Sequence, residues 1–244
     1  MELRNILKTR LWVYKFLSRC FYPEPSWKEL QDAPANNLFR RLINMESEHV
    51  NSGLCLLADV IDTLPQWTKV DWEKLRQEYQ RLFIGPGSLP VPPWESVYVS
   101  EERIILDEHT LAVREIYREW GLEVAHVNQE PDDHIGLELE FMAVLTKRGL
   151  HCSHTENQHL LTQILETQHT FLTNHLFSWV DQFCSMLVRS SKHPLYRGIA
   201  MFMPEYLRVD AELIEEIIAT LKFVKNQHQG GNDSCRDLFP AEHF

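Results

Sequence analysis

Glycine is scarce in this chain, with nine glycines among 244 residues, and β-branched residues do not gather in alternating runs. Both features disfavour β-strands. The chain also lacks any run of about 18 apolar residues, the length needed to cross a bilayer. Basic residues interrupt the N-terminal stretch at short intervals, which is unlike a signal peptide. We therefore expect an all-α protein of the cytoplasm.

Paired cysteines are lacking as well. The five cysteines form no Cys-x-x-Cys pair, and they are Cys20, Cys55, Cys152, Cys184 and Cys235. Their number is odd, and a chain of this size does not need disulfides to fold. They are expected to be free thiols in a reducing compartment.

Positive charge is in deficit. The formal net charge is 24 − 35 = −11 with neutral histidines. A chain with no basic stripe is a poor candidate for binding nucleic acid, because it cannot displace phosphate counterions. Its charge instead favours a basic partner. Exposed ion pairs contribute only about 0.2–1 kcal/mol each, so the charge would guide the approach of such a partner more than it would add to the affinity.

Apolar residues recur at helical spacing over most of the chain. The first stripe runs from Leu3 to Phe21 and is stopped by Pro23. Similar stripes predict about ten helices, packed as a single globular domain over residues 1–226. Residues 227–244 contain two adjacent glycines and are expected to form a loose tail.

Several residues suggest where helices begin and end. Asp71 is expected to cap one helix, and Ser153 with Glu156 to open another as a capping box. Gly121 is a plausible C-cap. Pro204 should kink or end the helix in which it lies.

The first unusual segment combines an aromatic helix face with a stiff loop. Tyr79, Leu82 and Phe83 precede residues 85–94, Gly-Pro-Gly-Ser-Leu-Pro-Val-Pro-Pro-Trp. Prolines restrict such a loop in advance, so little ordering entropy would oppose binding at Trp94. The same aromatics could equally be core residues, with Trp94 closing the loop onto the body of the domain.

The second unusual segment begins at Glu130 and contains Pro131, Asp132, Asp133, His134 and Glu138, in that order. His134 and Glu138 are four residues apart and share a helix face, as acid–base groups or metal ligands do. No third ligand stands at a diagnostic spacing. The alternatives are a helix cap with acidic first-turn residues, a binding surface, or a metal or catalytic site.

Sequence signatures of catalysis are lacking. No nucleophile elbow, dinucleotide-binding glycine pattern or phosphate-binding loop is present, since no Gly-Lys-Ser/Thr follows Gly85-Pro86-Gly87. We therefore expect no catalytic residues, no metal and no cofactor.

Several segments together resemble the TorD/DmsD family of redox-enzyme maturation chaperones. They are Glu78-Tyr79-x-x-Leu82-Phe83, residues 92–98 (Pro-Pro-Trp-Glu-Ser-Val-Tyr), Tyr117 with Gly121-Leu122, and Pro131-x-Asp133-His134-x-x-x-Glu138-Leu139-x-Phe141-Met142. The resemblance implies a helical chaperone, monomeric or domain-swapped. It would bind the twin-arginine signal peptide and apo form of a molybdopterin oxidoreductase of the dimethyl-sulfoxide-reductase class. It would hold that precursor until the molybdenum cofactor is inserted, before export.

The resemblance also suggests which residues bind the client. By position, the peptide groove would include Tyr79, Leu82, Phe83, Pro93, Trp94, Asp133 and His134. Asp133, Glu95 or Glu138 could meet a guanidinium group of the arginine pair. If so, the loop at Trp94 and the helix start at Asp133-His134 should meet in space.

Two features depart from the family pattern. Tyr79 is a departure if relatives place tryptophan there, and Asp132 extends Pro-Asp-His to Pro-Asp-Asp-His. Two other functions stay open on the sequence: a metal- or nucleotide-dependent enzyme using His134 and Glu138, and a helical interaction protein that binds no signal peptide. The sequence leaves the client reductase, the oligomeric state, guanine-nucleotide binding and the role of Cys235 open.

Overall fold

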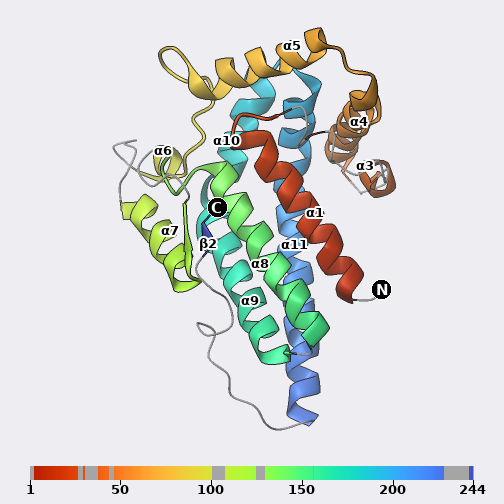
Figure 1. The fold of residues 1–244 in the computed structure, drawn as a ribbon, viewed down its shortest axis with the longest axis vertical. Helices are drawn as coiled ribbons and strands as arrows, with labels where there is room; N and C mark the ends of the chain where they lie inside the picture. Colours follow the sequence, from red (N-terminus) through yellow and green to blue (C-terminus); the bar gives the residue numbers. More distant parts are fainter. Residues whose placement is uncertain are drawn as a thin grey trace. The chain divides into compact units, whose positions relative to one another are not determined.

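The structure is a computed structural model that describes most of the chain (Figure 1). The described residues are 3–26, 30, 38–43, 47–100, 108–124, 130–155, 157–227 and 242–243. The predicted loose tail, with Cys235, lies outside the described residues apart from Gln227, which is the last residue of α11, and residues 242–243. Glu156, the second half of one predicted capping box, also lies outside them.

Helices make up nearly all of the described secondary structure. The α-helices are α1 (Leu3–Phe21), α3 (Leu38–Leu42), α4 (Glu48–Thr63), α5 (Lys69–Tyr79), α6 (Ser96–Val99), α7 (Glu108–Glu119), α8 (Ile135–Thr155), α9 (Gln158–Phe171), α10 (Phe177–Ser190) and α11 (Pro194–Gln227). A 3₁₀ turn, η1 (Leu64–Gln66), follows α4, and π-helical turns η2 (Gln80–Ile84) and η3 (Leu172–Leu176) follow α5 and α9. The two-residue strands β1 (Leu122–Glu123) and β2 (Glu242–His243) pair in parallel.

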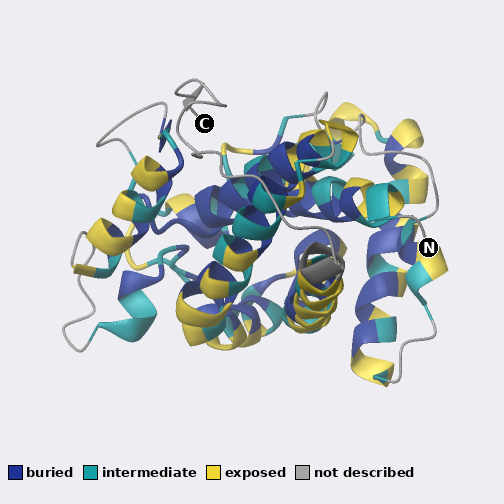
Figure 2. Cartoon of the chain, turned by 90° about the horizontal axis from the view of Figure 1, so that it is seen from below, coloured by how far each residue is buried: buried dark blue, intermediate teal, exposed yellow. Residues whose placement is uncertain are grey.

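The prediction of an all-α fold is confirmed. The first apolar stripe forms α1 over the predicted residues. Figure 2 shows the result of the helical spacing of apolar residues: on many helices the buried residues lie on one side and the exposed residues on the other. No helix among the described residues is long and apolar enough to span a membrane.

Two predicted helix starts are wrong. Thr68, not Asp71, is the N-cap of α5, and Asp71 is the N3 partner of a capping box with it. Asn157 caps α9 by accepting the Leu160 N–H at 3.0 Å. Ser153 lies inside α8, where its hydroxyl donates to the Leu150 carbonyl. In both cases a second side chain with a good capping oxygen lies a few residues from the predicted one. The local sequence does not show which of the two candidates caps the helix.

Pro204 does not end its helix, because α11 continues on both sides of it. Proline removes one backbone hydrogen bond and crowds the preceding turn. The residues around it, Phe202, Met203 and Leu207, are almost completely buried. Packing of these side chains offsets the local penalty, as tertiary burial commonly overrides helix propensity.

The contacts divide the chain into two compact units. Unit 1 comprises residues 1–18, 94–178 and 208–244, and unit 2 comprises residues 19–93 and 179–207. In unit 1, α8 and α9 lie side by side (Figure 1). Tyr117 of α7, Phe141 of α8 and Phe171 of α9 form an aromatic cluster there, with ring centroids 4.8–6.2 Å apart.

Unit 2 has a core of its own. Phe21, Phe83 and Tyr196 have ring centroids 5.4–6.2 Å apart. α4 and the first part of α11 approach closely at two glycines, where a Cβ on Gly53 would lie 2.7 Å from the Cβ of Met201. Only a residue without a side chain permits that approach.

Unit 1 also holds a buried ion pair that joins distant parts of the chain. The Arg10 guanidinium donates to both carboxylate oxygens of Asp210, at 2.6 and 3.0 Å, and to the Gln168 side chain. The Tyr14 hydroxyl donates to the same aspartate at 2.6 Å. Both charged side chains are at least 97% buried, so each depends on the other for compensation.

Replacing Asp210 with alanine should therefore destabilise the fold strongly. We expect a loss of about 3–5 kcal/mol in the free energy of unfolding, because a buried guanidinium loses its carboxylate. Urea denaturation measures it. Glu212→Ala, at an exposed position of the same helix, is the matched control and should cost less than about 1 kcal/mol. Equal losses in the two variants would contradict the assigned role of the pair.

Candidate functional site

The loop that ends at Trp94 and the start of α8 meet in unit 1, as the resemblance predicted. Trp94 and His134 form an antiparallel backbone bridge, and the Glu95 N–H donates to the Asp133 carbonyl at 3.0 Å. The Trp94 and His134 rings lie edge to face, with centroids 6.4 Å apart. The Trp94 indole N–H donates to the Glu130 carboxylate at 2.7 Å. Backbone and side chain thus both hold the tryptophan in place.

Asp133 joins three segments by its carboxylate. One oxygen accepts the Ser96 backbone N–H, in the first turn of α6, and the other accepts the Thr110 hydroxyl of α7, both at 2.9 Å. The side chain is completely buried. Burial raises the pKa of Asp133, while the hydrogen bonds from Ser96 and Thr110 lower it, and the net shift is upward.

His134, not Asp133, caps α8. Its carbonyl accepts the Leu137 and Glu138 N–H groups, and its ring Nδ1 accepts the Gly136 N–H at 3.0 Å. This ring nitrogen must be unprotonated to accept that bond. Burial lowers the pKa of His134 to about 3, so the ring is neutral near pH 7.

Asp132 ties the same turn to α7. The Arg114 guanidinium donates twice to one Asp132 oxygen, at 2.7 and 3.0 Å, and the Tyr117 hydroxyl donates to the Asp132 carbonyl. The ion pair raises the pKa of Arg114. The additional aspartate, which departs from the family pattern, therefore anchors the loop to the neighbouring helix.

Glu95 reaches the π-helical turn η3. Its carboxylate lies 3.0 Å from the His175 Nδ1 and accepts the Ser178 hydroxyl at 3.1 Å. The serine hydroxyl also donates to the His175 carbonyl. This is not the arrangement of a hydrolase triad, because the serine contacts the carboxylate and not an imidazole nitrogen. The described residues contain no group of three or more side chains suited to hold a metal ion.

Most of the nine predicted client-binding residues are buried. Tyr79, Leu82, Phe83, Pro93, Glu95, Asp133, His134 and Glu138 all fall in this class, and Trp94 is half-buried. The burial agrees with the alternatives in which these side chains are core or capping groups. Their part in client binding is left as a prediction.

Within unit 2, Tyr79, Leu82 and Phe83 lie at the junction of α5 and η2. The Tyr79 hydroxyl donates to the Phe21 carbonyl at 2.9 Å, and the Tyr79 and Phe83 rings are 5.3 Å apart. Ile84, the next residue, leaves 62% of its surface exposed. The segment thus carries its aromatics into the core and presents one aliphatic side chain outside.

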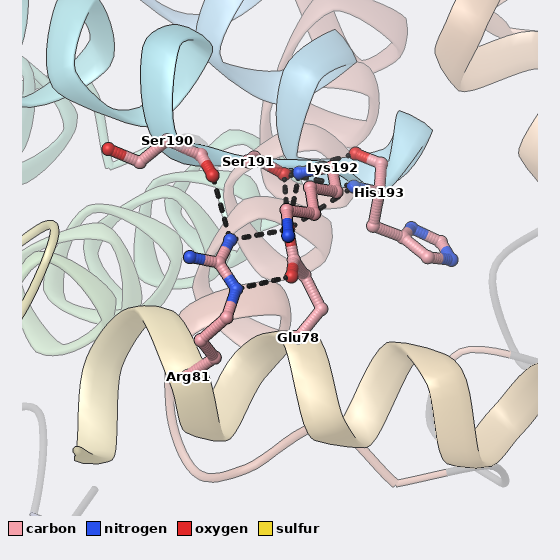
Figure 3. Close-up of polar contacts among 6 residues, drawn as sticks. All are labelled: Glu78, Arg81, Ser190, Ser191, Lys192 and His193. Carbon is pink, nitrogen blue, oxygen red and sulfur yellow. Dashed lines mark hydrogen bonds and ion pairs between the residues drawn. The ribbon is translucent and has the colours of Figure 1, made fainter. Parts of the chain in front are cut away.

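Two charged residues of the same segment hold the turn between α10 and α11 (Figure 3). The Glu78 carboxylate accepts the Lys192 and His193 backbone N–H groups and the Ser191 hydroxyl. Arg81 donates to both oxygens of Glu78 and to the Ser190 carbonyl, the latter at 2.7 Å. Burial opposes ionisation, but the donors outweigh it and lower the pKa of Glu78.

Sequence reasoning missed the residues that support the site. The pattern Glu78-Tyr79-x-x-Leu82-Phe83 assigned no role to Glu78 or to Arg81, although their i, i+3 spacing indicates an ion pair. Thr110 and Ser178 carried no local signal. They become partners only because the segments before α8 and α6 bring the carboxylates of Asp133 and Glu95 to them.

Comparison with known proteins identifies relatives. A family model described as nitrate reductase delta subunit matches residues 46–185, more than half of the chain. The Tat proofreading chaperone DmsD of Salmonella paratyphi A is 36% identical over 127 residues, which cover 52% of this chain and 55% of that protein. The match thus spans about half the length of the curated relative.

Two further relatives extend the similarity. A probable Tat proofreading chaperone DmsD of Haemophilus influenzae is 33% identical over 53% of this chain and 56% of its own length. The chaperone protein TorD of Vibrio parahaemolyticus is 22% identical, over 86% of this chain and 96% of its own.

The neutral His134 cap predicts a loss of stability in acid. Its folded-state pKa of about 3 lies below the ordinary 6.5, so the unfolded chain takes up the proton first as the pH falls. The contribution of the neutral His134 ring to the free energy of unfolding is complete above pH 6.5 and is lost as the pH falls towards 3. Between pH 7 and pH 5 the wild type should lose about 2 kcal/mol more than His134→Asn, which keeps a capping oxygen but does not titrate.

Urea denaturation at the two pH values measures this difference. The control is His154→Asn, which removes an exposed histidine near the other end of α8. The control should retain the wild-type pH dependence. A His134→Asn variant with the same dependence as the wild type would rule out the buried neutral ring as its source.

The Glu78 contacts predict a different loss in unit 2. Glu78→Ala should lower the free energy of unfolding by about 2–4 kcal/mol, because the turn after α10 loses its acceptor. Glu73→Ala is the matched control. It breaks an exposed pair of the same spacing with Arg76 on the same helix, and should cost less than about 1 kcal/mol. Similar losses of stability in the two variants would contradict the role assigned to the Glu78 hydrogen bonds.

Proposed function

Because this chain belongs to the nitrate reductase delta subunit family, we propose that it is a cytoplasmic chaperone without chemical turnover. Its client is the precursor of a molybdopterin oxidoreductase of the dimethyl-sulfoxide-reductase class. The chain binds the apo form and its twin-arginine signal peptide and holds them until the molybdenum cofactor is inserted. The relatives named as Tat proofreading and TorD chaperones support this proposal.

The observation that carries the proposal is the junction between Trp94 and His134. Two segments about 40 positions apart in the sequence, both part of the family resemblance, meet through a backbone bridge and an indole hydrogen bond to Glu130. Trp94 is held at its N–H edge and remains half-buried, so part of a large apolar ring stays accessible. A contact residue held in this way loses little freedom on binding.

Trp94 is therefore the proposed direct contact for the apolar part of the signal peptide. We assign the buried members of the predicted set a positioning role. Glu95, Asp133, His134 and Glu138 shape and hold the junction in unit 1. Tyr79, Leu82, Phe83 and Pro93 do the same for the segment that ends α5 in unit 2.

The charge of the chain supports a cationic client segment. A net charge of −11 attracts an arginine pair and speeds association, most strongly at low salt. Affinity would come mainly from apolar burial, at about 25 cal/mol per Å² removed from water.

Co-purification tests the function. A tagged copy of this chain, expressed in anaerobically grown cells, should retain a molybdoenzyme precursor. Deletion of the client's signal segment should abolish or strongly weaken that retention. A partner retained equally well without its signal would instead favour a general helical interaction protein.

A variant at Trp94 tests the contact itself. Trp94→Ala should weaken binding of a twin-arginine signal peptide by about 1–3 kcal/mol, the range for a buried aromatic at a binding site. Titration calorimetry measures the change. Trp67→Ala, another half-buried tryptophan, serves as the control. Unchanged affinity in a folded Trp94→Ala protein would remove Trp94 from the binding site.

A further inference from the structure

The π-helical turn η3 belongs to unit 1 and carries His175 at its fourth position. Such turns are rare and frequently lie at functional sites. Thr173 and Asn174 of this turn are exposed, whereas His175 is buried. The turn therefore directs its one ionisable side chain into the protein.

The His175 ring is held from two sides. It stacks on Phe171, four residues earlier, with ring centroids 5.0 Å apart and an angle of 27° between the planes. Its Nδ1 lies 3.0 Å from one carboxylate oxygen of Glu95. An ionised carboxylate only accepts hydrogen bonds, so the Nδ1 carries the proton in this contact. The ring thus presents an N–H donor in a fixed direction.

Glu95 depends on this donor more than on its second one. The Ser178 hydroxyl lies 3.1 Å from the other Glu95 oxygen but 2.6 Å from the His175 carbonyl. A hydroxyl has one proton, so the nearer carbonyl competes for it. The Glu95 side chain is 1% exposed, and a carboxylate buried to that extent is costly to leave without a donor. Of the two donors, His175 is therefore the one on which the carboxylate depends.

Glu95 directly follows Trp94, and its backbone is fixed as well. Its N–H donates to the Asp133 carbonyl, and its own carbonyl accepts two N–H groups of α6. With the carboxylate bound to His175, this residue is held at its N–H, its carbonyl and its side chain. The direction in which the Trp94 side chain leaves the backbone is thus set by Glu95 on one side and by the backbone bridge of Trp94 on the other.

We infer that His175 is a positioning residue for client binding: by holding Glu95, it sets the orientation in which the half-buried Trp94 ring meets the signal peptide. The identity of the client rests on the proposed function. The coupling of His175 to Trp94 rests on the contacts described above. In this assignment His175 does not touch the peptide, and the π-helical turn η3 becomes part of the site.

Two substitutions at His175 separate the hydrogen bond from the bulk of the ring. His175→Asn places an amide N–H close to the position of Nδ1, whereas His175→Leu removes the donor. In titration calorimetry, His175→Leu should weaken binding of a twin-arginine signal peptide about tenfold, and His175→Asn should stay within about twofold of the wild type. Equal losses in the two variants, or wild-type affinity in both, would contradict the inference.

His169→Leu is the matched control. His169 of α9 also contacts a glutamate, because its Nε2 lies 2.8 Å from the Glu215 carboxylate, but that glutamate belongs to α11 and is largely exposed. Loss of this surface contact should leave the peptide affinity within about twofold of the wild type. A loss as large as that of His175→Leu would point to general stabilisation and not to positioning.

A double-mutant cycle tests whether His175 acts through Trp94. In a Trp94→Ala background, His175→Leu should weaken peptide binding by less than about twofold, because the ring that His175 orients is gone. A further loss of about tenfold in this background would show that His175 acts independently of Trp94. That result overturns the inference and leaves the proposed function intact.

An NMR measurement needs no client. The indole N–H resonance of Trp94, assigned with Trp94→Phe, reports on the hydrogen bond to Glu130. It should move in His175→Leu and stay near its wild-type position in His175→Asn and His169→Leu. If the wild type binds no signal peptide, the proposed function fails, and this resonance still decides the coupling. A folded His175→Leu protein in which the resonance does not move refutes the inference.

A second variant covers the case in which His175→Leu does not fold. His175→Gln keeps a polar side chain, but its amide lies near the position of Nε2 and not of Nδ1, so the donor no longer faces Glu95. It then replaces His175→Leu in all three experiments, with the same expected results and the same outcomes that would overturn the inference.

Discussion

The described geometry of the Trp94 junction depends on one buried carboxylate. Asp133 accepts a backbone N–H from α6 and a hydroxyl from α7 while its own carbonyl binds the Glu95 N–H. A buried aspartate without such donors would be costly, because desolvation opposes its charged form. The hydrogen bonds from Ser96 and Thr110 stabilise the ionised carboxylate, and the carboxylate in turn fixes the positions of these two donors. The loop and the two helices are therefore positioned by the same group.

Unit 2 also contains a buried carboxylate that accepts several hydrogen bonds. At the turn between α10 and α11, Glu78 accepts hydrogen bonds from two backbone N–H groups, a hydroxyl and a guanidinium. In both units an acidic residue from one segment satisfies backbone donors of another. Segments far apart in sequence are thereby fixed relative to each other inside each unit.

The acidity of the chain thus has two separate roles. Buried carboxylates such as Asp133 and Glu78 are structural, and they would be poor first contacts for a cationic peptide because their oxygens are already engaged. The exposed carboxylates remain available to attract a cationic peptide. A count of acidic residues cannot separate these roles, because both kinds of carboxylate look alike in the sequence.

The sequence by itself determined the helical class and the span of α1, because apolar periodicity is a local signal. The meeting of the Trp94 loop with the start of α8 was predicted from the family resemblance and not from local pattern. Local pattern failed where neighbouring residues competed for one role: Thr68 and Asn157, not Asp71 and Ser153, cap α5 and α9. Only the tertiary structure decided which aromatic residues are core and which carboxylates are engaged. Burial and hydrogen-bond partners depend on residues as much as 200 positions away, as with Arg10 and Asp210, and no local pattern encodes such a distance.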